Sequence, residues 1–263
     1  MSKKRVLILI PARFASTRFP GKPLVSILGK SMIQRVFENC SISHHQDFLF
    51  ETYVVTDDEK IENHVKTFSS NVVRVDDDVS SGTLRIHLAF KRFFSELAYD
   101  LVINVQGDEP LLKRSELTAL AQFHLSSTFD IGTLVKKHQN FDSSFLDSNK
   151  VKVVMNENSG AVFYFSRAGI PYKRGASTDA DNDNNDYWFL HIGVYSYNPK
   201  ALLLFANATE SRLENLEKLE QLRALEIGLS IGAFPITSQI FGVDVPEDVK
   251  KVETALLSTN KEI

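Results

Sequence analysis

Three cationic side chains, Arg13, Arg18 and Lys22, follow an apolar run near the N-terminus of this 263-residue chain. Several Ala, Ser, Thr and Gly residues lie between them, so that backbone amides of the loop can approach a ligand closely. A loop of this kind after a buried strand suits anion binding, and its chemistry fits a triphosphate. The alternative is a solvated cationic loop. Neither GxxxxGK[ST] nor GxGxxG is present here, so neither a P-loop NTPase nor a Rossmann dehydrogenase is indicated.

Two carboxylates that could bind a metal are far apart in the sequence. Asp108 follows the apolar segment 100–105, and Asp244 lies between two valines, where we expect a strand to end. Mg²⁺ usually takes one or two carboxylates together with substrate phosphates. No cap or salt-bridge partner is evident near either residue in the sequence, so we predict that the two meet and share Mg²⁺. The alternative for Asp108 is a turn residue.

Other acidic residues have simpler interpretations. Asp57 and Asp58 follow the strand-like segment 51–56; they could bind a metal, but Asp is a common helix N-cap and we favour that role. The run 76–78 is interpreted as a solvated loop. Glu109 precedes a proline and is interpreted as structural.

The elements that must position these residues alternate between strands and helices. Residues 6–10 are continuously apolar and end at Pro11, which predicts a strand buried on both faces of a parallel sheet. Helical spacing over 31–40, with Ser31 as cap, leads to the strand 51–56 and a further helix. We therefore predict an α/β fold with a mostly parallel sheet flanked by helices. Further predicted elements are strands at 72–75, 100–105, 131–135, 151–154, 160–165 and 191–197, and helices at 115–125, at 212–228 and through 249–256.

Composition limits the class of protein. With 43% apolar residues, the chain can form one domain, residues 1–263, with an elaboration. The net charge of −3 is spread along the chain and gives no face for nucleic acid and no membrane anchor. Cys40 is the only cysteine, and no segment is long enough for a signal or spanning helix. We expect a soluble cytoplasmic protein. Residues 175–186 predict a mobile loop rather than a calcium site.

The order PARxxSxRxPGKPL over residues 11–24 resembles the opening signature of the CMP-Kdo synthetase (3-deoxy-manno-octulosonate cytidylyltransferase) family. The resemblance continues in order along the chain, at 56–58, 81–83, 105–111, 165–171, 191–195, 219–223 and 243–248. It implies transfer of CMP from CTP to the anomeric hydroxyl of a 3-deoxy-2-keto sugar acid, most simply 3-deoxy-manno-octulosonate (Kdo), for lipopolysaccharide biosynthesis. The alternatives are a related acid (8-amino-Kdo or a nonulosonate), or an inactive nucleotide-binding regulator.

The resemblance also implies the roles of individual residues. It implies Mg²⁺ as cofactor, a homodimer, and an inserted antiparallel sheet over 137–200 for substrate binding and dimerisation. Leu84 departs from the family pattern SGTDR, which has Asp there. The implied nucleotide-binding residues are Pro11, Ala12, Arg13, Arg18, Lys22, Ser81, Gly82, Arg85 and Gln106; the catalytic residues are Arg13, Lys22 and Asp108; the metal ligands are Asp108 and Asp244; and the sugar-binding residues are Arg167, His191, Tyr195, Glu220 and Gln221.

The residues themselves allow two interpretations of the sugar site. The planar guanidinium of Arg167 can donate two hydrogen bonds to one carboxylate, and the alternative is that Arg167 is an ordinary surface arginine. Strand alternation places His191 and Tyr195 on one polar, aromatic face. Glu220 falls inside the apolar arc of the predicted helix 212–228, where it could bind sugar hydroxyls or form a purely structural ion pair with Arg223.

Overall fold

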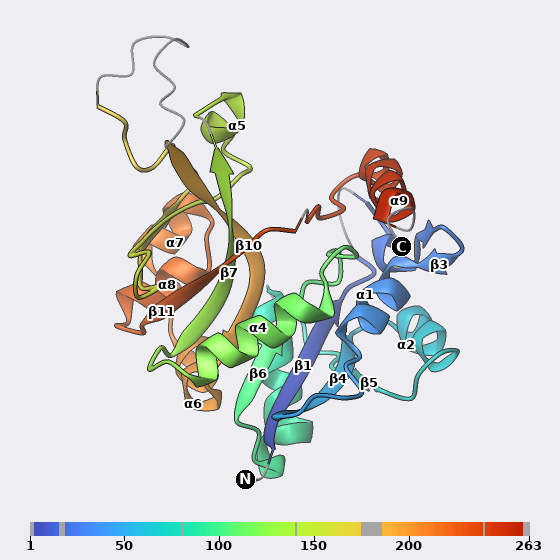
Figure 1. The fold of residues 1–263 in the computed structure, drawn as a ribbon. Coiled ribbons are helices and arrows are strands. Elements are labelled where there is room, and N and C mark those ends of the chain that lie inside the picture. Colours follow the sequence, from blue (N-terminus) through green and yellow to red (C-terminus); the bar gives the residue numbers. More distant parts are fainter. Residues whose placement is uncertain are drawn as a thin grey trace. The chain divides into compact units, whose positions relative to one another are not determined.

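Figure 1 shows the computed structural model of the chain, which describes residues 3–15, 19–79, 81–139, 141–174, 186–238 and 240–259. Arg18 and residues 175–185 of the predicted mobile loop lie outside the described residues. The chain forms two compact units, one of residues 1–121 and 239–263 and the other of residues 122–238. The segment 137–200, predicted as an insertion, lies within the second unit.

The first unit contains a parallel sheet with the strand order β6-β1-β4-β5. Residues 6–10 of β1 are completely buried, as expected for a central parallel strand covered by helices on both faces. Because β1 lies between β4 and β6 (Figure 1), the segments that follow these three strands emerge side by side. The strands are β1 (Lys4–Ala12), β4 (Phe48–Thr56), β5 (Val72–Arg74) and β6 (Leu101–Asn104), with a separate small pair β2 (Ser26–Ile27) and β3 (Lys30–Ser31).

Side-chain caps fix where the helices of the first unit begin. The Ser31 and Ser81 hydroxyls accept from backbone amides of Gln34 and Leu84, both at 3.2 Å. The carboxylate of Asp58 accepts from two amides of α2, so its predicted cap role is confirmed. The helices are α1 (Met32–Cys40), α2 (Glu59–Lys66), α3 (Gly82–Ala89) and α9 (Pro246–Thr259), with short helical turns η1 (Lys22–Leu24), η2 (Phe90–Phe94) and η3 (Ser95–Leu97); α4 (Arg114–Leu125) begins in this unit and ends in the second.

The second unit is built on a largely antiparallel sheet with the order β11-β7-β10-β8-β9, in which only β11 and β7 run parallel. The predicted hairpin is present as β8 and β9. Strand β10 has a bulge between Ile192 and Tyr195 where it pairs with β7. The strands are β7 (Ile131–Gln139), β8 (Lys152–Met155), β9 (Val162–Ser166), β10 (Tyr187–Tyr197) and β11 (Ile231–Ile236), and the helices are α5 (Ser143–Leu146), α6 (Pro199–Asn207), α7 (Arg212–Glu217) and α8 (Gln221–Glu226).

The predicted single helix over 212–228 is wrong. The structure has α7 and α8, separated at Lys218, whose φ of 51° is left-handed. Arg167 Nε donates to the Glu217 carbonyl at 2.6 Å, and an Arg167 terminal nitrogen donates to the Lys218 carbonyl at 3.3 Å. Those carbonyls would otherwise accept within a continuous helix, so the arginine stabilises the break. The break also leaves Leu216 65% exposed, whereas the continuous leucine pattern predicted burial.

A second difference concerns Asp244. It does not lie at the end of a strand, because residues 240–245 form an irregular segment before α9. Its backbone amide and that of Val245 donate to the Asp248 carboxylate, at 3.1 and 3.2 Å. The start of α9 therefore fixes the position of Asp244. Among the described residues, no helix has the length and apolar character needed to span a membrane.

Lys152 on β8 provides a test of the second unit's stability. It is completely buried, and its ammonium donates to the carbonyls of Asp147, Lys150 and Arg167 at 2.9, 2.6 and 2.6 Å. Lys152→Met keeps the volume but removes the donor, so it should lower the free energy of unfolding by about 2 to 4 kcal/mol. Denaturant unfolding measures this effect, with Lys200→Met, at an exposed lysine, as control. Equal losses in the two variants would contradict the role of Lys152.

Candidate active site

Residues predicted to bind nucleotide come together at the carboxyl ends of β1 and β6. A Cβ atom on Gly82 would lie 3.2 Å from Pro11 Cγ and 3.8 Å from Gln106 Oε1. A Cβ atom on Gly107 would lie 2.9 Å from the Pro11 carbonyl oxygen, which is closer than Cβ atoms approach other heavy atoms in proteins. Glycine is therefore needed at position 107 for the close approach of these segments, and position 82 leaves little room for a side chain. The Ser81 hydroxyl accepts from the Leu84 amide and so caps α3.

Lys22 joins the two carboxylates that were predicted to meet. Its Nζ atom lies 2.6 Å from Asp108 Oδ2 and 4.0 Å from Asp244 Oδ1, and it donates to the Val243 carbonyl at 2.9 Å. Both distances are measured from the same Lys22 nitrogen. The Asp108 and Asp244 oxygens therefore can be no farther apart than the sum of these two distances. The Val243 amide also donates to the Asp108 carbonyl at 3.0 Å, so the backbone holds the two segments together.

This geometry corrects one sequence inference. Asp108 and Asp244 were expected to have no salt-bridge partner, but Lys22 pairs with Asp108 directly. The lysine is 86 residues from Asp108 in the sequence, so no local pattern could have shown the pair. The proximity of the two carboxylates was nevertheless predicted, and the structure places them around one cation.

Glu109 adds an acidic group beside this cluster. Its Oε2 atom is buried without a hydrogen-bond partner among the described residues, and a Cβ atom on Gly242 would lie 3.4 Å from its Oε1 atom. Burial, followed by the negative charges of Asp108 and Asp244, raises the pKa of Glu109 to about 8. The side chain is therefore mainly protonated at neutral pH, which limits the negative charge around Lys22.

A second group of charges lies at the end of β4. Asp57 forms an ion pair with Arg85 at 2.7 Å and lies 3.8 Å from Arg13 Nε. The Arg85 side chain is fully buried and also donates to the Val75 carbonyl. Burial, the largest effect, lowers the pKa of Arg85, and Asp57 opposes that shift.

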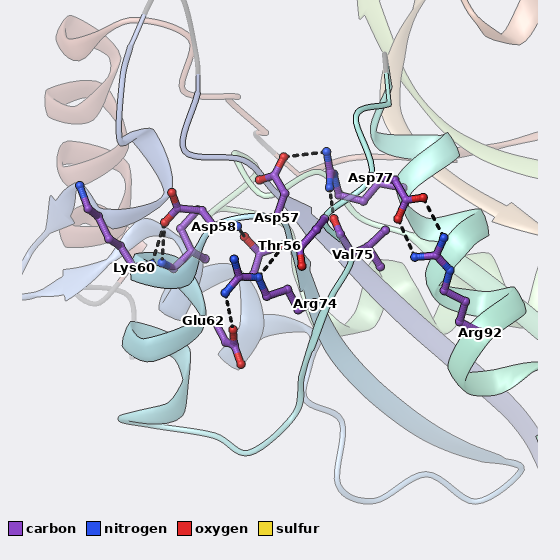
Figure 2. Close-up of polar contacts among 12 residues, drawn as sticks. Thr56, Asp57, Asp58, Lys60, Glu62, Arg74, Val75, Asp77 and Arg92 are labelled. Atoms are coloured by element: carbon purple, nitrogen blue, oxygen red, sulfur yellow. Dashed lines mark hydrogen bonds and ion pairs between the residues drawn. The ribbon is translucent and has the colours of Figure 1, made fainter.

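Two sequence interpretations change as a result. Arg85 was predicted to contact nucleotide, but its guanidinium is completely buried and pairs with Asp57 and the Val75 carbonyl. Asp57 was interpreted as a helix cap, and only Asp58 has that role. The missed signal was topological: β4 pairs with β1 in parallel, so a carboxylate after β4 lies beside the cations that follow β1. Two of the three carboxylates of the 76–78 run form ion pairs, since Asp76 pairs with Arg74 and Asp77 with Arg92 (Figure 2).

In the second unit, the predicted polar face of β10 is present. The His191 and Tyr195 rings lie 5.2 Å apart, and His191 Nε2 lies 3.3 Å from Thr133 Oγ1. Burial lowers the pKa of His191 to about 3, so the imidazole is neutral, and burial raises the pKa of Tyr195 well above its usual value. The Tyr195 hydroxyl and Gln221 Nε2 are buried without hydrogen-bond partners among the described residues. Buried polar atoms in this state are suited to a ligand with hydroxyl groups.

Two other predictions for this unit are not supported. The Arg167 guanidinium, expected to bind a sugar carboxylate, donates to the carbonyls of Ser148, Glu217 and Lys218. The ion pair between Glu220 and Arg223 is absent, because Arg223 lies 3.3 Å from Glu214 and donates to the Ala208 carbonyl. Glu214 belongs to the capping box that begins α7, and the helix break brings its carboxylate to Arg223.

No group of three or more His, Cys, Asp or Glu side chains is arranged as a metal centre within the described ranges. Asp108 and Asp244 remain the pair with a cation between them. Such a pair suits an ion that takes its other ligands from phosphates and water.

Comparison with known proteins agrees with this arrangement. A sequence profile of the cytidylyltransferase family matches residues 7–231. The 3-deoxy-manno-octulosonate cytidylyltransferase of Parabacteroides distasonis is 40% identical over 246 residues, which cover 92% of this chain and 94% of that protein. The 8-amino-3,8-dideoxy-manno-octulosonate cytidylyltransferase of Shewanella pealeana is 42% identical over 255 residues, covering 95% and 98%.

A solved structure shows the same fold. CMP:2-keto-3-deoxy-manno-octonic acid synthetase complexed with CTP superimposes with a TM-score of 0.85 at 32% identity, covering 98% of this chain and 100% of that chain. The fold and the family match define a nucleotidyltransferase. The chain belongs to the cytidylyltransferase family, and the resemblance to CMP-Kdo synthetases in its motifs is confirmed.

The neutral state of His191 predicts a pH dependence of stability. The unfolded histidine has a pKa of 6.5, and the folded one about 3, so below pH 6.5 the unfolded chain takes up the proton first. This contribution to stability is complete above pH 6.5 and is lost as the pH falls toward 3, by about 1.4 kcal/mol per pH unit. The unfolding free energy of His191→Gln should therefore fall less steeply below pH 6.5 than that of the wild type, whereas the exposed His44→Gln should follow the wild type. Parallel curves for all three proteins would show that His191 is not buried as described.

Proposed function

We propose that this protein transfers CMP from CTP to the anomeric hydroxyl of Kdo. The hydroxyl oxygen attacks the α-phosphorus, the bond from that phosphorus to the bridging oxygen of the β-phosphate breaks, pyrophosphate leaves, and the hydroxyl proton goes to solvent. The observation that carries the proposal is the Lys22 ammonium between Asp108 and Asp244, beside the close approach of Gly107 to the Pro11 carbonyl at the strand ends. In-line transfer of this kind requires positioning and charge neutralisation more than covalent chemistry.

The first unit supplies the cations for the nucleotide. Lys22 and Arg13 follow β1, the strand whose carboxyl end lies between those of β4 and β6. Asp57 holds Arg13 from one side, so that its guanidinium has a defined position relative to the strand end. In this proposal, Arg13 and Lys22 bind the triphosphate oxygens and stabilise the charge that grows on the departing pyrophosphate.

The residues around Lys22 also fit Mg²⁺. Asp108, Asp244 and the Val243 carbonyl already arrange oxygen atoms around one cation, the Lys22 ammonium. Oxygen ligands with one or two carboxylates are those that Mg²⁺ prefers beside phosphates. Asp108 and Asp244 would hold the ion, which when bound neutralises triphosphate charge.

The second unit supplies candidates for the acceptor. The Tyr195 hydroxyl and the Gln221 amide are buried donors without protein partners among the described residues, and His191 is a neutral ring beside Tyr195. Polar groups in this state favour a ligand that satisfies them, and a polyhydroxylated acid does so. Glu220, beside Gln221, is half-buried and contributes an acceptor for sugar hydroxyls.

The identity of the acceptor is tested by a panel. Relatives named for Kdo and for 8-amino-3,8-dideoxy-manno-octulosonate are similar to this chain at 40% and 42% identity, so both acids must be compared. With CTP and Mg²⁺, we expect pyrophosphate release with a higher kcat/KM for Kdo than for the 8-amino acid. A preference for the 8-amino acid would reassign the acceptor, and no release with any sugar acid would contradict the enzymatic proposal.

Lys22→Ala tests the nucleotide site. Losing a charge-assisted contact costs about 1.5 to 3 kcal/mol, so we expect kcat/KM for CTP to fall roughly tenfold to a hundredfold. Steady-state pyrophosphate release measures the change, and Lys30→Ala, at a more exposed lysine paired with Glu38, is the matched control. Unchanged kinetics in Lys22→Ala would remove this loop from the site.

A further inference from the structure

Lys22 has a position that a purely phosphate-binding lysine does not need. Its side chain is only 16% exposed, and its ammonium is directed to the Asp108 carboxylate, the Val243 carbonyl and, more distantly, Asp244. Two of the three ammonium donors are used by the Asp108 carboxylate and the Val243 carbonyl, whereas Asp244, at 4.0 Å, is an ion-pair neighbour only. Lys22 therefore pairs with Asp108 and lies close to Asp244, the two proposed metal ligands.

The carboxylates do not depend on Lys22 for their proximity. The Val243 amide donates to the Asp108 carbonyl at 3.0 Å, which ties the two segments by their backbones. Asp248 accepts from the Asp244 and Val245 amides and fixes the start of α9. Without the lysine, the two carboxylates would stay close and repel each other, and a divalent cation would relieve that repulsion.

The base of the Lys22 side chain is also fixed. The Gly21 backbone has a φ of 71° and donates to the Phe14 carbonyl at 3.0 Å, and Lys22 itself begins the helical turn η1. Movement of the ammonium must therefore come from its flexible four-carbon stem. The ammonium can leave the carboxylates without any change in the strands.

We propose that Lys22 is an internal counter-ion that competes with the divalent cation for Asp108 and Asp244. This inference rests on the proposed function. A metal ion bound to the carboxylate oxygen that Lys22 now contacts would lie within a few Å of the ammonium, and the two positive charges repel. Metal binding thus requires the ammonium to leave, and the triphosphate provides the anion that receives it. Nucleotide and metal therefore favour each other's binding, by an amount that is the same in both directions.

The test is metal affinity, measured without turnover. Mn²⁺ is titrated into the wild type, Lys22→Met and the control Lys30→Met, followed by electron paramagnetic resonance of the free ion, with and without CTP and always without acceptor. Without nucleotide, Lys22→Met should bind Mn²⁺ about tenfold to a hundredfold more tightly than the wild type, because the competing charge is gone. CTP should tighten Mn²⁺ binding more in the wild type than in the variant.

Two further variants test where the metal binds and whether the protein is folded. Asp244→Asn in the Lys22→Met background should remove the gain, and a gain that persists would place the metal elsewhere and overturn the proposal. Thermal unfolding checks that Lys22→Met is folded, and Lys22→Gln replaces it if it is not. Equal or weaker Mn²⁺ binding by the nucleotide-free variant also overturns the proposal. Because the wild type's pyrophosphate release is measured separately, failure of this inference is distinguishable from failure of the proposed function.

Discussion

Charge balance at the carboxyl ends of three parallel strands is the constraint on which the first unit depends. Strand β1 lies between β4 and β6, so the acidic and basic residues that follow them share a small volume. Asp57 is balanced by Arg85, Asp108 by Lys22, and Glu109 by keeping its proton. An unbalanced charge in such a site would cost several kcal/mol, so the groups can only change partners together. A ligand that adds phosphate charge must therefore bring or attract cations with it.

The backbone, more than the side chains, fixes where these charges lie. Gly82 and Gly107 allow two segments to approach Pro11, and the Val243 amide joins the segment after β6 to the one before α9. These contacts involve no titratable group, so they persist when the charges are rearranged. The site thus combines a rigid frame with one long, flexible cation, Lys22, and that combination allows an exchange of partners without a change of fold.

Most of the fold could be predicted from the sequence, because its signals are local. The apolar run of β1, the cap at Ser31 and the alternation in β10 each act within a few residues. The helix over 212–228 failed because a distant residue, Arg167, takes the carbonyls at the break. The spacing of leucines along the sequence gives no information about such a contact.

The site was predicted less completely, for a related reason. Which residues are charged is written in the sequence, and the proximity of Asp108 and Asp244 was predicted, although Asp244 does not follow a strand. Which charge binds which is decided by three-dimensional order, so the pairing of Asp57 with Arg85 and of Lys22 with Asp108 was missed. Hydrogen bonds from a side chain to backbone carbonyls are even harder to predict, since every residue has a backbone carbonyl. For this reason Arg167, which donates to backbone carbonyls, was predicted to bind a ligand.

The substitution at Leu84 can be judged in the same terms. Aspartate is expected at this position in the family pattern, and its loss raised the possibility of an inactive protein. However, α3 begins with the Ser81 hydroxyl accepting from the Leu84 amide, a cap that does not involve the side chain at position 84. The neighbouring Arg85 takes its carboxylate from Asp57, so it does not need an acidic residue beside it. Leucine at position 84 therefore leaves both the helix start and the buried ion pair intact.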